Sequence, residues 1–191
     1  MDKIRCPWAP PSDPLYTEYH DLEWGVPKYD DRMLFELLIL EGAQAGLSWR
    51  TILYRRENYR QCFQNFDPQK VAAFTPTDVE QLMQNQGIIR NRKKIESAIS
   101  NAKLFLDIQK QHGSFSSYYW NWVDGKPIVN HFQTMKEVPA KTTLSEKISN
   151  DLYKRGMRFV GPVIMYAYMQ STGMVNDHLA SCYRHREINP D

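Results

Sequence analysis

The sequence predicts an all-α protein, and three observations support this fold class. Apolar residues recur at intervals of three and four along most of the chain, whereas alternating apolar and polar runs are few. A capping residue followed by proline, which is a helix start signal, occurs three times, at Asp13-Pro14, Asp67-Pro68 and Thr75-Pro76. No tandem repeat is evident. With 191 residues, 42% of them hydrophobic, the chain can form one domain or two small lobes that share a cleft.

The first half of the chain is expected to form five helices. The first twelve residues are rich in proline and irregular, and the first helix begins after Asp13. A second helix begins at residues 30–31 and is broken by Gly46. Ser48 is expected to cap a third helix that continues to about Phe66. The proline signals at positions 67 and 75 then begin two short helices.

The second half is expected to contain three helices before a glycine-rich turn, over residues 91–112, 116–123 and 143–155. Residues 126–142 lack periodicity and contain two prolines, so they are predicted to form a loop. Thr143-x-x-Glu146 has the spacing of a capping box for the last of these helices. The tail after Cys182 is short and polar and is expected to be mobile.

Composition limits the class of protein. The formal net charge is only +2, so any nucleic-acid surface must be a local patch. Three cysteines, an odd number, argue against a disulfide framework. The N-terminus lacks the basic start followed by an apolar run that is typical of a secretory signal. No span approaches the ~20 apolar residues that a membrane helix needs. We therefore expect a soluble cytoplasmic protein that has no membrane partner.

The stretch from 154 to 182 carries the first functional signal. Gly156 and Gly161 lie on either side of a short turn between two helical patterns. Bare N–H groups at the start of the second helix would form an anion site, although a helix corner in the core fits the spacing equally well. The basic residues beside the turn, which favour a nucleic-acid phosphate as the anion, are Lys154, Arg155 and Arg158. A second basic run, which could equally be a solvated face, comprises Arg90, Arg92, Lys93 and Lys94.

A metal site is suggested by His178 and Cys182, which lie four residues apart and so share one helix face. Two ligands do not complete a structural zinc site, which usually has four. Cys6 and His20, near the other end of the chain, are candidates for completion, but on spacing alone residues so placed are more often unrelated to such a site. Possible substitutes are Cys62 and His185. Three dispersed cysteines exclude an iron–sulfur cluster with four thiolates.

Glu41 is the residue that we expect to carry the chemistry. It ends an apolar run just before Gly42, where a carboxylate is costly unless it has a partner. A helix-terminal surface position is the commoner place for a glutamate. The functional alternative is a cavity whose aromatic rings stack on an extruded purine. The rings considered, each of which also fits ordinary core packing, are Trp8, Tyr16, Tyr19 and Trp49.

Four motifs together resemble the DNA-3-methyladenine glycosylase I family of the helix–hairpin–helix superfamily. They are Gly156-x-x-Phe159-Val160-Gly161-Pro162 followed by Val175-Asn176-Asp177-His178, the run from Gly87 to Ile95, the run from Asp13 to Gly25, and the run from Leu40 to Trp49. The matches extend from Cys6 to Cys182 and are specific only in combination. In most of the superfamily an aspartate after the hairpin helix is catalytic, whereas counting residues places Asn176 in that position here.

The resemblance implies an all-α helix–hairpin–helix glycosylase fold, with two helical lobes around a base-binding cleft in a single domain of residues 1–191. The hairpin lobe would span about 67–125, and the terminal segments and the hairpin 143–182 would complete the cleft. A structural zinc ion would join the two ends of the chain through Cys6, His20, His178 and Cys182. The residues implied to contact the base are Trp8, Tyr16, Tyr19, Glu41 and Trp49. Those implied to contact DNA are Gln44, Gly46, Leu47, which would be an apolar wedge, Lys154, Arg158 and Gly161.

The implied activity is base-excision repair of alkylated double-stranded DNA by a monomeric enzyme that releases free 3-methyladenine. This base is cationic in DNA and leaves readily, so rings and the Glu41 carboxylate would act by binding and electrostatic stabilisation. No lysine is placed as a nucleophile for strand cleavage. Two alternatives remain: a related glycosylase for another alkylated or oxidised base, and a non-enzymatic helix–hairpin–helix DNA-binding module with a structural zinc. A buried Glu41 among rings would favour an enzyme over the module.

Overall fold

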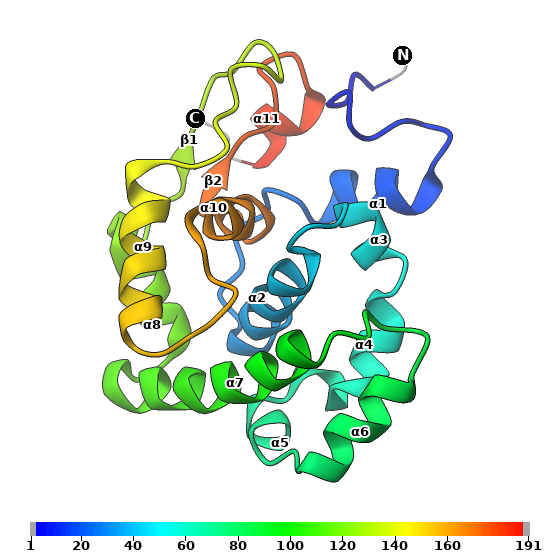
Figure 1. The fold of residues 1–191 in the computed structure, drawn as a ribbon. Coiled ribbons are helices and arrows are strands. Elements are labelled where there is room, and N and C mark those ends of the chain that lie inside the picture. Colours follow the sequence, from blue (N-terminus) through cyan, green and yellow to red (C-terminus); the bar gives the residue numbers. More distant parts are fainter. Residues whose placement is uncertain (1–2, 189–191) are drawn as a thin grey trace.

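The computed structural model describes residues 3–188 and is mostly helical, as the sequence predicts (Figure 1). In chain order the elements are α1 (Pro14–Leu22), α2 (Asp31–Gln44), α3 (Trp49–Leu53), α4 (Arg56–Cys62), η1 (Gln64–Phe66), α5 (Pro68–Ala72), α6 (Pro76–Gln84), α7 (Arg92–His112), α8 (Phe115–Trp120), η2 (Asn121–Val123), β1 (Ile128–Val129), α9 (Thr143–Lys154), α10 (Pro162–Ser171), β2 (Val175–Asn176) and α11 (Tyr183–Ile188). No helix among these residues is long and apolar enough to cross a membrane.

The three proline start signals each begin a helix. Asp13 accepts a hydrogen bond from the Tyr16 N–H, and Pro14 occupies the first turn of α1. Asp67 caps α5 in the same way, and Thr75 caps α6 through a complete capping box. The signals work because proline lacks an N–H that would be unpaired there in any case. The predicted starts of α1, α5 and α6 are therefore confirmed.

The single helix expected from Ser48 to Phe66 is wrong, because the chain forms three short pieces there. Ser48 does cap α3, but α3 ends at Leu53, and α4 begins after Arg55 without a side-chain cap. Gln64, Asn65 and Phe66 then have φ values of 55°, 52° and 53°, which a continuing α-helix does not allow. The apolar spacing persists through these breaks because all three pieces pack on the same core.

Three expectations for the second half need correction. The capping box of α9 uses Thr142 and Ser145, one residue earlier than predicted, and Thr143 is the first helical residue. The predicted loop 126–142 contains β1, which pairs in parallel with β2. The tail after Cys182 forms α11, in which His185 is buried, so mobility is wrong for 183–188. Residues 189–191 lie outside the described part of the chain.

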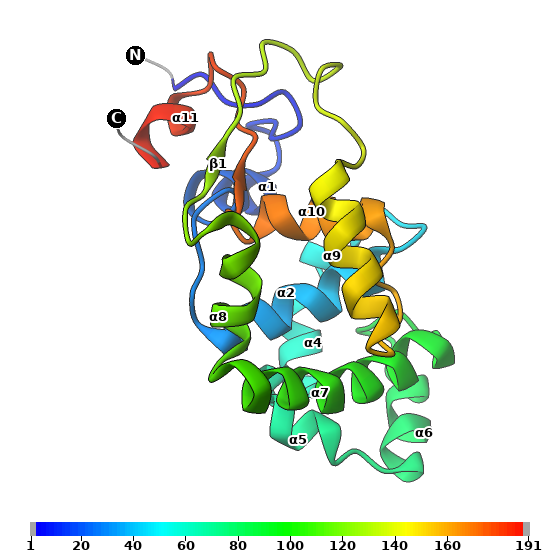
Figure 2. The same cartoon turned by 90° about the vertical axis from the view of Figure 1, so that its left-hand side faces the viewer.

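Helix α2 occupies the middle of the molecule and is packed against α7, α8 and α10 (Figures 1 and 2). Every residue from 34 to 43 is buried, including Glu36 and Glu41. A helix that is apolar on all sides belongs in a core, and this one carries a carboxyl group in its last turn into the interior. The position of Glu41 is thus fixed by the burial of α2 as a whole.

The two ends of the chain meet at one end of the molecule. The segment before α1 lies beside the segment that leads to α11, and the Tyr183 N–H donates to the Ile4 carbonyl at 2.9 Å (Figures 1 and 2). A small apolar cluster of Cys6, Leu179 and Cys182 lies there, with Trp8 and Trp24 packed against it. This cluster is separate from the main core, which runs from α2 to β2.

Candidate functional site

A cavity of about 220 Å³ lies between the N-terminal segment, α1, α2, α3 and α10. Its wall contains all of the residues that the sequence proposed for a base pocket, namely Trp8, Tyr16, Tyr19, Glu41 and Trp49, together with Gln44. It also contains residues that sequence reasoning did not assign to the pocket, namely Trp24, Met135, Val138, Ala167, Gln170 and Asp177. The structure therefore brings the proposed base-binding residues together, and their roles remain predictions.

Glu41 faces this cavity while being only 3% exposed. Burial raises the pKa of its carboxyl group to about 8, and a hydrogen bond with Ser171 opposes part of the rise. With its nitrogen facing Glu41, the Gln44 side-chain amide donates to Glu41 Oε2 at 2.8 Å, and its oxygen accepts from the main-chain N–H of Trp49 at 3.3 Å. Among the described residues Glu41 forms no ion pair with a lysine or arginine. A cation that entered the cavity would be its first close positive charge.

Aromatic rings cover the wall around the carboxyl group. The Trp8 ring lies 5.1 Å from Tyr16 and 4.9 Å from Trp24, between ring centroids, and Tyr19 lies 5.4 Å from Trp49. The indole N–H of Trp49 is buried and has no hydrogen-bond partner among the described residues. An unpartnered buried donor is costly, so this N–H is suited to an acceptor on a molecule bound in the cavity.

Asp177 is a second buried acid in the cavity, and it differs from Glu41 in its surroundings. It is 1% exposed, and its oxygens accept from Tyr166 at 2.6 Å, Asn130 at 2.7 Å and Gln170 at 2.8 Å. These three donors hold the carboxyl group against the cavity wall. The residue comes directly after Asn176, so the motif contained it, but the spacing alone did not show which of the two side chains faces the cavity.

Asn176, which residue counting placed in the catalytic position, does not line the cavity. Its side-chain amide nitrogen donates to the His185 carbonyl at 3.0 Å, and its side-chain oxygen accepts from the main-chain N–H of His178 at 3.2 Å. Both partners belong to the C-terminal segment. Asn176 is thus directed at the C-terminal segment, whereas Asp177, the residue that follows β2, lies in the cavity wall. The catalytic position that counting assigned to Asn176 stays a prediction.

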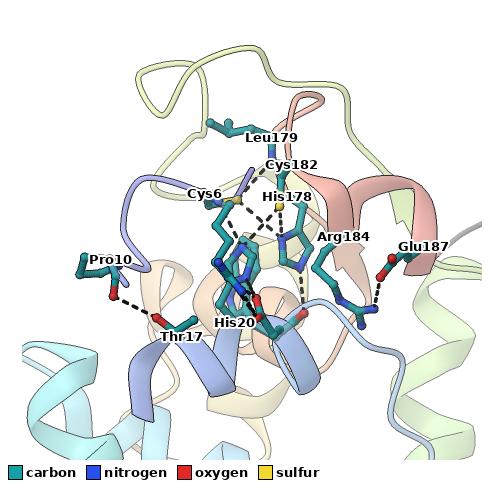
Figure 3. Close-up of polar contacts among 12 residues, drawn as sticks. Cys6, Pro10, Thr17, His20, His178, Leu179, Cys182, Arg184 and Glu187 are labelled. Atoms are coloured by element: carbon teal, nitrogen blue, oxygen red, sulfur yellow. Dashed lines mark hydrogen bonds and ion pairs between the residues drawn. The ribbon is translucent and has the colours of Figure 1, made fainter. Parts of the chain in front are cut away.

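The four residues proposed as metal ligands converge at the meeting point of the chain ends (Figure 3). All are buried, and their ligand atoms lie within 4.8 Å of one another. Cys182 Sγ is 3.5 Å from both His20 Nε2 and His178 Nδ1, and Cys6 Sγ is 3.6 Å from His178 Nδ1. Neighbouring ligands on a tetrahedral zinc ion, with Zn–N of about 2.0 Å and Zn–S of about 2.3 Å, would be separated by about 3.5 Å. The spacing therefore fits such an ion.

The outward nitrogens of both histidines have acceptors. His20 Nδ1 lies 2.8 Å from Asp21 Oδ1, and His178 Nε2 lies 3.0 Å from the Trp24 carbonyl. These contacts place a proton on the outward nitrogen and leave the inward nitrogen as a lone-pair donor, which is what a metal requires. The two alternatives raised from the sequence lie elsewhere: Cys62 contacts Asn85, and His185 contacts the Asn130 carbonyl.

The residues expected to touch DNA lie on two loops. Leu47 is 41% exposed on the turn after α2, beside Gly46, whose φ is +77°. Gly161 caps α10, and a Cβ added there would meet nothing within 4 Å. The second loop is the turn between α9 and α10. Lys154, at the end of α9, and Arg158, within the turn, are exposed, and the Arg158 guanidinium lies over the Tyr153 ring.

The second basic run is only partly available to a ligand. Arg92 pairs with Glu80 at 2.8 Å, and Lys94 donates to two main-chain carbonyls at the C-terminal end of α2. Arg90 and Lys93 are exposed. The run of like charges in the sequence therefore does not act as one positive patch.

Comparison with known proteins gives a consistent result. The family model described as methyladenine glycosylase matches residues 8–185. DNA-3-methyladenine glycosylase 1 of Escherichia coli (strain K12) is 49% identical over 178 residues, which is 93% of this chain and 95% of the relative. A crystal structure of 3-methyladenine DNA glycosylase I superposes with a TM-score of 0.90 at 49% identity, covering 94% of this chain and 98% of that one. A variant of 3-methyladenine DNA glycosylase I in complex with 3-methyladenine also gives 0.90, at 37% identity, covering 94% of this chain and 96% of that one.

Proposed function

This chain belongs to the methyladenine glycosylase family, and we propose that it hydrolyses the N-glycosidic bond of 3-methyladenine in alkylated DNA as the first step of base-excision repair. The observation that carries this proposal is the buried carboxyl group of Glu41 in a cavity walled by aromatic rings. A module that only grips DNA has no use for such a group. The cavity is therefore the feature that separates an enzyme from the non-enzymatic alternative.

The chemistry of the lesion matches the cavity. Methylation at N3 gives the base a positive charge, so breaking the bond between C1′ and N9 leaves the bonding electron pair on a base that becomes neutral. Water then adds to C1′ and loses a proton. Because the leaving group needs little protonation, the protein has to capture the extruded cation and stabilise the positive charge as it moves toward the sugar.

Glu41 and the aromatic rings would make the cavity selective for the cationic 3-methyladenine over the neutral adenine. Each aromatic face attracts a cation by about 0.5–2 kcal/mol, and an ordinary adenine lacks the charge. Burial disfavours the charged carboxylate in the empty cavity, as the raised pKa of Glu41 indicates. A cationic base favours the carboxylate, so it would lower that pKa and bind to the ionised form. We propose Glu41 as the catalytic residue and Trp8, Tyr16, Tyr19 and Trp49 as the base-contacting rings.

Zinc is the metal that we propose for the cluster at the chain ends. Two thiolates and two imidazoles are a usual structural donor set for Zn²⁺, and the four residues leave no position for a substrate. When bound, the ion would supply cross-linking and no catalytic chemistry. Cys6 and His20 would hold it from the N-terminal side, and His178 and Cys182 from the C-terminal side.

The DNA contacts are proposed on the same basis. In a helix–hairpin–helix arrangement, α9, the turn and α10 would hold phosphates through the N–H groups near Gly161 and through Lys154 and Arg158. Leu47 would enter the duplex where the base leaves, with Gln44 and Gly46 beside it. We propose a single domain of residues 1–191 that acts as a cytoplasmic monomer on double-stranded DNA. Its hairpin lobe (67–125) and the remaining segments would form the two sides of the cleft.

A base-release assay tests the function. DNA treated with a methylating agent is incubated with the enzyme, and the freed bases are separated by chromatography. We expect 3-methyladenine to be released and 7-methylguanine to remain almost entirely in the DNA. Binding to the DNA without release of any base would favour the module, and release of a different base would favour the related glycosylase.

Replacement of Glu41 by alanine tests its role. The variant should lose most of the release activity, by about a hundredfold or more, because an electrostatic group in a desolvated site is removed. Its circular dichroism spectrum should match that of the unaltered enzyme, since alanine favours a helix and the change removes a buried carboxyl group without adding a polar one. Unchanged release by a folded variant would remove Glu41 from the mechanism.

A further inference from the structure

Lys94 is the one member of its basic run whose ammonium group is directed into the protein. Its Nζ donates to the Ala43 carbonyl at 2.8 Å and to the Ala45 carbonyl at 2.7 Å. Lys93 next to it is exposed and forms no such contact among the described residues. An ammonium group with two main-chain partners is largely committed to them and has little left for a phosphate.

The Ala43 carbonyl lies in the last turn of α2, and the Ala45 carbonyl lies at its C-cap, where the loop that carries Leu47 begins. At the end of α2 the last carbonyls have no partner within the helix. The Gly42 carbonyl accepts from the Ala45 N–H, and the Gln44 carbonyl accepts from the Leu47 N–H at 2.6 Å. Lys94 donates to the two alternate carbonyls, those of Ala43 and Ala45. No basic residue lies in the last turn of α2 itself, so the cation comes from α7.

The same face of α7 also holds the turn between α9 and α10. Asn101 lies seven residues after Lys94, which is about two helical turns or roughly 10 Å along the axis. Its amide nitrogen donates to the Arg158 carbonyl at 2.8 Å, and its amide oxygen accepts from the Arg158 N–H at 2.9 Å. Figure 2 shows the turn after α9 lying against α7. One helix therefore anchors both loops.

The turn between α9 and α10 also meets the last turn of α2 directly. Phe159, at the tip of the turn, has a φ of +55°, and its side chain lies so close to Gly42 that a Cβ added there would be 3.3 Å from Phe159 Cβ. A small cavity between α2, α7 and Phe159 is bordered by Gly42, Lys94 and Asn101. The position of the turn relative to the end of α2 is thus set by α7 and by this close contact, and Lys94 ties the start of the loop that carries Leu47 to the same helix.

We propose that Lys94 is a positioning residue for base extrusion, which fixes the loop that carries Leu47 relative to the turn that grips the phosphates. This inference rests on the function proposed above. Leu47 and the phosphate-binding turn between α9 and α10 would act on the same DNA. A shift of one loop relative to the other would therefore displace Leu47 from the base step, while the base pocket itself stays intact. Errors of about 1 Å in such placement can cost about a hundredfold in rate.

The test compares Lys94→Met with Lys93→Met, which removes the same charge from the adjacent position. Release of 3-methyladenine is measured under single-turnover conditions from methylated duplex DNA and from the same DNA after denaturation. Affinity for free 3-methyladenine is measured by tryptophan fluorescence. Lys94→Met should slow release from the duplex by about tenfold or more beyond Lys93→Met, with free-base affinity within about twofold of the unaltered enzyme. The loss on single strands should be smaller, because no base pair has to be opened.

A double-variant cycle shows whether Lys94 acts through Leu47. If it does, Lys94→Met combined with Leu47→Ala should be no slower than Leu47→Ala alone. If the fold-loss in release rate of the double variant equals the product of the fold-losses of the two single variants, the proposal is overturned. Equal losses of rate in Lys94→Met and Lys93→Met would also overturn it. Lys94→Arg, which keeps two donors, should recover part of the rate. If Lys94→Met does not fold, Lys94→Gln replaces it in the same cycle.

Amide hydrogen exchange separates this proposal from the proposed function. The N–H groups of residues 45–47 should exchange faster in Lys94→Met than in Lys93→Met, whether or not the enzyme releases any base. Equal exchange in the two variants would overturn the positioning role. Failure of the unaltered enzyme to release 3-methyladenine would instead overturn the proposed function.

Discussion

At the scale of single residues, two buried acids share one cavity in different surroundings. Asp177 is held by three donors, whereas Glu41 has an amide, a serine and aromatic rings around it. A carboxyl group that is desolvated without a cation favours its neutral form. Glu41 is therefore the group whose charge responds most to what enters the cavity.

This difference gives a pH-dependent stability that Glu41→Gln should remove. In the unfolded chain Glu41 ionises near its ordinary pKa of 4.5, and in the folded protein only near 8. Between these values the folded state keeps a proton that the unfolded state has lost, so the Glu41 contribution to the free energy of unfolding decreases as the pH rises through this window. Above about pH 8 the folded protein carries the full cost of burying an ionised Glu41 carboxylate, which lowers the free energy of unfolding by on the order of a few kcal/mol.

Urea unfolding of both proteins measures this effect. The stability advantage of Glu41→Gln over the unaltered protein should be small at about pH 5 and should grow to a few kcal/mol at about pH 9. A difference that is the same at both pH values would mean that the carboxyl group is not desolvated in the folded protein.

At the scale of elements, glycine-containing turns fix the segments around the cavity. Gly173, in the turn after α10, has a φ of +73°, and a Cβ there would lie 2.3 Å from the Val26 carbonyl carbon. The backbone on both sides is tied, since the Gly25 N–H donates to the Gln170 carbonyl and the Lys28 N–H donates to the Thr172 carbonyl. No side chain fits between these two segments.

Gly173→Ala should accordingly be far more destabilising than Gly113→Ala. Gly113 has a similar φ of +83°, but a Cβ there would meet nothing within 4 Å, so alanine adds only backbone strain of about 1 kcal/mol. For Gly173 we expect a loss of about 3 kcal/mol or more, because the backbone of residues 26–27 has to move. Chemical denaturation of both variants checks this, and equal losses would show that the segments are not in tight contact.

The elements also show what the sequence could predict. Cap-plus-proline signals are local, so the starts of α1, α5 and α6 were predictable from a few residues. The breaks around Arg55 and Asn65 carry no glycine or proline, and they depend on how α3 and α4 pack on the core. The orientation of Asp177 depends on the pairing of β2 with β1, across 47 residues of sequence. Met135 and Val138 reach the cavity from a loop without any periodic pattern, so no local signal marked them.

At the scale of the whole molecule, the cavity and the metal-ligand cluster are built from the same segments. Cys6 lies two residues before Trp8, His20 follows Tyr19, and His178 follows Asp177. The Trp24 ring packs on the His178 imidazole with a centroid distance of 4.6 Å. Loss of the proposed zinc ion would therefore be expected to loosen one wall of the cavity while leaving the main core intact.

Cys182→Ser and Cys62→Ser test this link. Cys182→Ser should lose bound zinc, lower the melting temperature by about 5 °C or more, and weaken binding of 3-methyladenine. Cys62→Ser changes a thiol outside the cluster, which contacts Asn85, and should keep the full metal content. Elemental analysis and thermal unfolding measure both. Undiminished zinc in Cys182→Ser would show that the ligand set is wrong.

The closeness of Cys6 to His178, across 172 positions of sequence, has a consequence for synthesis in the cell. On the ribosome, the helices from α2 to α8 can emerge and begin to pack while His178 and Cys182 are still inside the exit tunnel. The N-terminal wall of the cavity then lacks its C-terminal partners until synthesis has passed Cys182. A nascent chain would thus acquire its compact body before it acquires the ability to recognise damage.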